Sequence, residues 1–163
     1  MSPRSLALML VVACSPYAPT TQSAGHFGAA TCAYELTQRA TAVALLERDY
    51  LASIEAASGE ELFDLYRNYN RLIGTWVQVD LLQGLLEDAI DDRHSDAAAR
   101  SALRDQANYL SWELDTAIAG FENDAKGTRA HAYSRLAEDS LALLSNVRVT
   151  VDRLYLETEK GIP

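Results

Sequence analysis

Residues that bind cofactors through sulfur or imidazole are scarce in this sequence, which has two cysteines, two methionines and three histidines among 163 residues. Both methionines, Met1 and Met9, fall near the N-terminus, and no Cys-x-x-Cys-His motif occurs. These absences exclude covalent haem attachment and a Met/His axial pair in the body of the chain. A glycine-rich phosphate loop and a Gly-x-Ser-x-Gly motif are missing too. The sequence therefore predicts no cofactor.

Basic residues are also few, because 14 lysines and arginines stand against 23 aspartates and glutamates, a net charge of −9. The acidic residues are spread along the chain and would repel the phosphates of a nucleic acid, so we expect no nucleic-acid partner. Long apolar runs are absent beyond the N-terminal segment. Since a membrane-spanning helix needs about 18 or more consecutive apolar residues, we expect the body of the protein to lie in water.

The N-terminal segment has the features of a secretion signal. Arg4 supplies a positive charge, and residues 6–13 form an apolar run shorter than the roughly 20 residues that span a bilayer. The run ends in Val11-Val12-Ala13-Cys14, which resembles the lipobox of bacterial lipoproteins. The resemblance implies removal of a signal peptide, 1–13, and acylation of Cys14, for example with palmitate.

The residue after the cysteine bears on where such a lipoprotein is sent. Ser15 resembles the outer-membrane-directed form, whereas an aspartate there is usual for retention at the inner membrane. The resemblance therefore implies a lipid anchor in the outer membrane, with the protein on the periplasmic face. Ordinary secretion with a Cys14–Cys32 disulfide is the alternative; with Cys14 acylated, Cys32 is expected to be a small buried residue.

The remaining chain divides into a tether and a single helical domain. Residues 14–30 lack charged side chains and are rich in Ser, Thr, Pro, Ala and Gly, which predicts a flexible tether. From residue 31 to 163, apolar residues recur at steps of three and four in four segments, about 31–57, 60–94, 96–126 and 128–160. Short connections join them. We predict an all-α protein, an up-down-up-down antiparallel four-helix bundle, with Thr31 capping the first helix.

One face of each predicted helix should form the core. The expected core-facing residues are Leu36, Ala40, Val43, Leu46, Tyr50 and Ile54; Leu62, Leu65, Tyr69, Leu72, Trp76, Val79, Leu86 and Ile90, with Gln83 interrupting the pattern; Leu103, Ala107, Leu110, Leu114, Ala117 and Phe121; and Tyr133, Ala137, Ser140, Leu144, Val147, Val151 and Leu154. The glycines inside helices, Gly74, Gly84 and Gly120, are expected to allow close approach of a neighbouring helix, with a hinge or kink in the helix as the alternative.

No combination of residues predicts a catalytic or metal site. Asp91 and His94 are one helical turn apart, but a di-metal bundle needs two Glu-x-x-His pairs and two further inward carboxylates. The other acidic residues have no base or nucleophile at a recognisable spacing. We therefore expect that the protein is not an enzyme and binds no metal.

Aromatic residues suggest a contact surface instead. By helical rise, Tyr50, Tyr66, Tyr69, Phe121 and Tyr133 should lie within about 15 Å of one end of the bundle, the end opposite the tether. The candidate partner-binding residues at that end are Tyr66, Arg67, Asn70 and Arg129.

These observations favour an envelope lipoprotein that acts as a protein-interaction or scaffold module. One alternative is a periplasmic sensor or small-ligand carrier, with its site between the helices near Trp76 and Trp112. Another is an immunity-type inhibitor whose acidic surface masks a basic toxin or enzyme.

Overall fold

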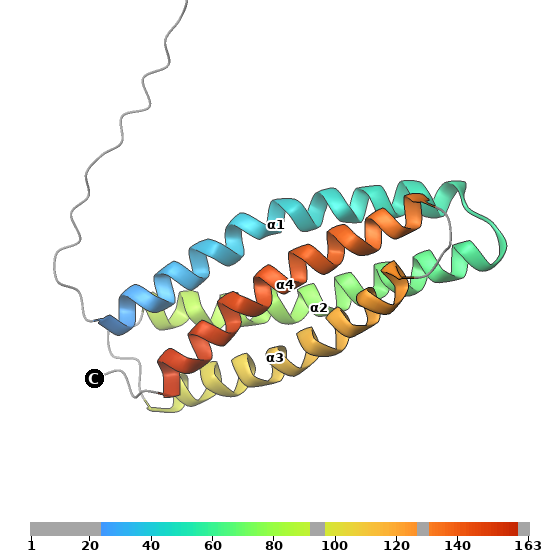
Figure 1. The fold of residues 1–163 in the computed structure, drawn as a ribbon. Helices are drawn as coiled ribbons and strands as arrows, with labels where there is room; N and C mark the ends of the chain where they lie inside the picture. The colour runs from blue at the N-terminus through green and yellow to red at the C-terminus, as the bar shows by residue number, and fades with distance from the viewer. Residues whose placement is uncertain (1–23, 92–96, 127–130, 160–163) are drawn as a thin grey trace, which may run out of the picture.

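The protein is an all-α four-helix bundle. The computed structural model describes residues 24–91, 97–126 and 131–159. Its helices are α1 (Ala24–Ala56), α2 (Gly59–Asp91), α3 (Ala97–Ala125) and α4 (His131–Glu159). Consecutive helices run antiparallel, and α1 also packs against α4, which closes the ring of four (Figure 1). The predicted up-down four-helix bundle is therefore confirmed.

The cores of α3 and α4 follow the predicted rows. All six core-facing residues expected in α3 and all seven expected in α4 are buried. Both rows advance strictly by alternating steps of three and four, which keeps one stripe of each helix turned toward its neighbours. Here the apolar period alone determines the packing face.

The core row of α2 differs from the predicted one. The buried residues that advance by threes and fours are Leu65, Asn68, Leu72, Thr75, Val79, Leu82 and Leu86. The predicted row had Gln83 as an interruption, but the core position at this level is occupied by Leu82. The Gln83 side chain lies at the edge and donates to the Thr37 hydroxyl of α1 at 3.0 Å. The row thus contains two polar residues, Asn68 and Thr75, that the apolar pattern misses. Trp76 is buried beside it, as predicted.

Helix α1 begins earlier than predicted. It starts at Ala24, so Thr31 lies inside the helix and is not its N-cap, and residues 24–30 of the predicted tether are helical. Gly28 is buried and Ala29 packs against the core, because α4 continues to Glu159 and offers them a surface. Ala40, predicted to face the core, is exposed, whereas the other five core residues predicted for α1 are buried. The rest of the tether and the signal peptide lie outside the described residues.

The turn between α1 and α2 depends on a glycine. Gly59 has φ of +62°, a left-handed conformation that a side chain disfavours. This turn lies at one end of the bundle, and the beginning of α1 lies at the other end, beside the end of α4 (Figure 1). We call the end with Gly59 the distal end.

Candidate functional site

A network of charged side chains joins α2 to α3 near the distal end. The two carboxylate oxygens of Asp124 each accept from one arginine, Arg67 at 2.9 Å and Arg71 at 2.8 Å. Arg67 also pairs with Asp64 at 2.9 Å. Two guanidinium groups and two carboxylates therefore balance one another's charge, and the network stays neutral overall.

Buried hydroxyl and amide groups extend this network into the core. Asn68, with no exposed surface, donates from Nδ2 to the Tyr133 hydroxyl at 2.9 Å and accepts from Arg71 at 2.5 Å. The Arg71 guanidinium also lies over the Phe121 ring, 5.1 Å from its centre. A Cβ on Gly120 would come within 2.5 Å of this guanidinium, so the group that approaches Gly120 closely is the Arg71 side chain.

The tyrosines of this region are held in their neutral form. Burial raises the pKa of the Tyr50 hydroxyl, which shares a hydrogen bond of 3.1 Å with Ser140. Burial also raises the pKa of Tyr133. The Tyr50 and Tyr69 rings lie 6.4 Å apart, so the predicted gathering of aromatic residues at the distal end is largely present. Hydroxyls that are hydrogen-bonded among paired charges hold the helices together at this level.

The candidate partner-binding residues separate into different environments. Tyr66 and Asn70 lie on the outward face of α2 and are exposed. Arg67, in contrast, is engaged with Asp64 and Asp124, so its charge is largely used within the bundle. Arg129 lies outside the described residues. Of the three described members, all are exposed, but only Tyr66 and Asn70 have no ion pair within the bundle.

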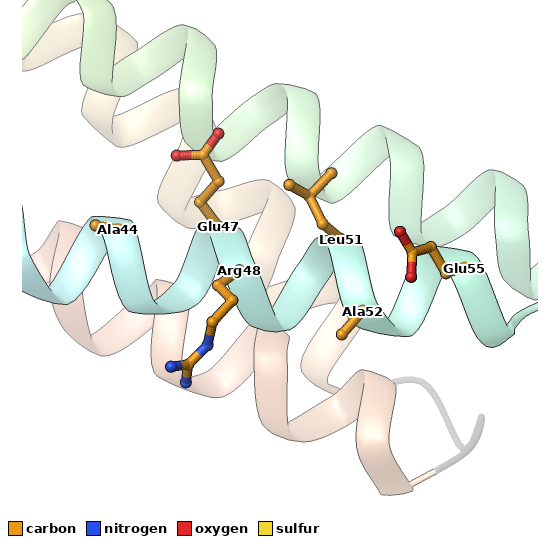
Figure 2. A pocket seen from close by; sticks show the side chains of 6 residues that line it. All are labelled: Ala44, Glu47, Arg48, Leu51, Ala52 and Glu55. Atoms are coloured by element: carbon orange, nitrogen blue, oxygen red, sulfur yellow. The ribbon is translucent and has the colours of Figure 1, made fainter.

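The ligand site considered between Trp76 and Trp112 does not bring these two residues together. Trp76 is buried in the core, whereas Trp112 is 62% exposed on the outside of α3, next to Tyr109. A shallow hollow of about 400 Å³ lies along α1 instead, lined by Ala44, Glu47, Arg48, Leu51, Ala52 and Glu55. Figure 2 shows Glu47, Leu51 and Glu55 pointing toward α2 and Arg48 pointing the opposite way. Because its lining comes from a single helix, this hollow offers no enclosure for a small molecule.

A second polar cluster joins α1 to α4 near the other end of the bundle. Glu35 accepts from Arg153 at 2.6 Å and from the Thr150 hydroxyl at 2.7 Å. The hydrogen bond from Arg153 is the main cause that lowers the pKa of Glu35 below its usual 4.5. Cys32 lies close by with no exposed surface, as predicted, and burial raises its pKa.

The Glu35 cluster predicts a particular dependence of stability on pH. Because folding lowers the pKa of Glu35, this carboxylate stabilises the fold above its unfolded-state value near 4.5, and the contribution disappears as pH falls through the folded-state pKa. We expect Glu35→Gln to lose less free energy of unfolding than wild type between neutral pH and the acid range. Urea denaturation at a series of pH values measures this difference. Arg153→Met should flatten the curve similarly, and an unchanged pH dependence in both variants would contradict the assignment.

Metal binding finds no support in the described part of the chain. Residues 24–91, 97–126 and 131–159 contain no group of three or more histidine, cysteine, aspartate or glutamate side chains placed to hold an ion. His94 lies outside these ranges, so the Asp91 and His94 pair stays untested. None of the four described helices has the length and apolar character needed to cross a membrane.

Comparison of the chain with protein-family models, with curated proteins and with solved structures gives no match. Function is therefore inferred from this chain's own residues.

Proposed function

We propose that the protein is an envelope lipoprotein that acts by binding other proteins and carries out no catalysis. The observation that carries the proposal is the outward face of α2, where Phe63, Tyr66, Val77 and Leu81 are each between 47% and 71% exposed. Contiguous exposed apolar side chains are typical of protein-binding surfaces. Aromatic side chains among them add contact area, and the tyrosine hydroxyl can form a hydrogen bond as well.

The polar groups of the bundle support a binding role over an enzymatic one. Near the distal end, Arg67 and Arg71 are paired with Asp64 and Asp124, and burial raises the pKa of Tyr133. A binding surface made of aromatic and amide groups needs no base or nucleophile with a shifted pKa. We therefore propose that the contact surface lies on the side of the bundle, along α2, and that Arg67 flanks it.

Acylation is proposed on the sequence Val11 to Cys14, and attachment to the outer membrane on Ser15. We expect the mature chain to begin at Cys14 and to carry acyl mass, and to partition with membranes. The variant Cys14→Ser should accumulate as an unprocessed precursor. Mass spectrometry of the purified chain measures both outcomes. Recovery of the native protein with Met1 intact and no added mass would overturn the anchor.

The binding role is tested by two matched pairs of substitutions. Tyr66→Ala with Asn70→Ala removes a tyrosine and an amide one turn apart on α2, and should weaken capture of envelope proteins roughly tenfold or more, as loss of an aromatic anchor can. Tyr34→Ala with Gln38→Ala removes the same pattern from the exposed face of α1 and should leave capture unchanged. Quantitative affinity capture on the solubilised full chain measures both. Equal capture by both pairs and wild type would overturn the proposed surface.

A further inference from the structure

The outward face of α2 carries an uninterrupted uncharged stripe. Its members share one side of the helix over roughly 32 Å of rise. We call this surface the α2 stripe; it consists of Phe63, Tyr66, Asn70, Ile73, Gly74, Val77, Leu81 and Gly84, of which Ile73 is partly buried against the core and the other seven are exposed. Arg67, which flanks it, is drawn toward α3 by Asp124. On a chain with a net charge of −9, such a stripe is the place where a like-charged partner meets the least repulsion.

Two glycines in this stripe have no explanation within the bundle. A Cβ on Gly74 or Gly84 would meet no atom within 4 Å, so the close approach expected there is not made by any described part of the chain. Each glycine nevertheless costs the helix about 1 kcal/mol relative to alanine. In contrast, Gly120 has a neighbour in Arg71 that a side chain would displace. A second helix packed against the α2 stripe would give Gly74 and Gly84 the same kind of role.

The order of large and small residues indicates which helix this is. Positions at equal distances on either side of the Ile73–Gly74 bond pair a bulky residue with glycine in two cases and two residues with longer side chains in the other two. These pairs are Ile73 with Gly74, Asn70 with Val77, Tyr66 with Leu81, and Phe63 with Gly84. An antiparallel copy of α2 brings just such positions together. The stripe is therefore complementary to itself when one copy is reversed.

We propose that two copies of this chain associate through their α2 stripes, antiparallel, about a twofold axis between Ile73 and Gly74. The same surface serves both copies, so the interface closes at a dimer. Phe63 of each copy then covers Gly84 of the other. This proposal rests on the proposed binding role of the α2 surface and names a second copy as its partner.

Side chains on α3 enlarge the contact. Gln106 of α3 lies against Gln78 of α2, with its amide nitrogen 3.3 Å from the Gln78 Oε1 atom, which places Trp112 at about the level of Gly74 in the antiparallel pair. Trp112 and Tyr109 are exposed, and their rings lie 6.4 Å apart. Burying these rings with the stripe in both copies removes on the order of 1,000 Å² from water, within reach of the smaller specific interfaces.

Cysteine cross-linking in the full chain distinguishes the antiparallel dimer from other arrangements. Gly74→Cys places two thiols beside the twofold axis, where facing α-carbons can approach within disulfide range. Leu81→Cys places them roughly 22 Å apart along the helix, too far to join. Mild oxidation should therefore yield a covalent dimer with Gly74→Cys and none with Leu81→Cys. Wild type, which retains Cys14 and Cys32, gives the background. If both variants cross-linked, the two helices would be parallel. If neither variant cross-linked, the helices would not be in contact at this surface. Either result overturns the proposal.

Sedimentation velocity separates this proposal from the broader one. Wild-type full chain, solubilised in detergent, should sediment as a dimer at tens of micromolar, and Leu81→Glu should weaken dimerisation at least tenfold while retaining its helical signal, since Leu81 is exposed. A monomeric wild type would overturn the dimer. If the wild type were monomeric and Tyr66→Ala with Asn70→Ala still weakened capture of envelope proteins, the proposed binding role would stand without the dimer. A dimeric wild type whose capture is insensitive to those changes would refute the binding role alone.

Discussion

Replacing Trp76 by aspartate is expected to remove most of the cooperative unfolding transition of this bundle. Trp76 is 8% exposed and packs beside the central row of α2. An unpaired carboxylate there costs several kcal/mol, comparable to the whole free energy of unfolding of a domain of this size. Thermal denaturation followed by circular dichroism measures the loss.

Trp112 supplies a matched control for this substitution. The side chain is equally large but 62% exposed, so Trp112→Asp should change the free energy of unfolding by no more than about 0.5 kcal/mol. Both variants should be compared at one low protein concentration, so that association does not contribute to the difference. If Trp76→Asp melted like wild type, or if the two variants were equally destabilised, the assignment of the buried face of α2 would be wrong.

Apolar periodicity predicts a helix well where that helix buries apolar residues alone or nearly so. Every residue of the predicted core rows of α3 and α4 is buried, because a strict three-four repeat needs no knowledge of the neighbours, although α4 also buries Leu136, Leu143 and Thr150 outside its predicted row. The same repeat in α2 passes through Asn68 and Thr75, which a pattern of apolar residues does not include. A strict count of spacing from Leu65 to Leu86 would have found them. Polar core positions can therefore be found from the three-four spacing, but not from a search for apolar residues.

The start of α1 could not be predicted for a different reason. Residues 24–30 have no charge pattern and contain two glycines, which locally favour a coil. They are helical because the end of α4 lies beside them, which is a property of the assembled bundle. Similarly, the sequence could place Tyr66 and Arg67 near one end, but it could not indicate that Arg67 forms an ion pair with Asp124 of another helix.

The position of Asn68 suggests a structural reason for the polar network. A polar residue in a core-facing row is satisfied only when its partner on another helix is at the right level, so it can fix the register between helices. Asn68 of α2 meets Tyr133 of α4 across the bundle, and Arg71 links the same amide to Asp124 of α3. Three helices are thereby aligned at one level, directly beneath the part of α2 that carries Tyr66 and Asn70.

The hydrogen bond between Asn68 and Tyr133 predicts a reversal of sign in a double-mutant cycle. Tyr133→Phe leaves the fully buried amide of Asn68 without its acceptor, which should cost about 1–3 kcal/mol of the free energy of unfolding. Asn68→Leu alone removes one of the two donors to the Tyr133 hydroxyl, which keeps Arg67 at 3.4 Å, and leaves one donor of Arg71 without its acceptor, so it should also destabilise. When Tyr133→Phe is already present, however, Asn68→Leu removes the unpaired amide and should recover the part of the lost stability that exceeds the cost of the lost Arg71 hydrogen bond. Urea denaturation of the four proteins measures the cycle. Simple addition of the two losses would mean that Asn68 and Tyr133 act independently, and that the network does not set the register of the helices.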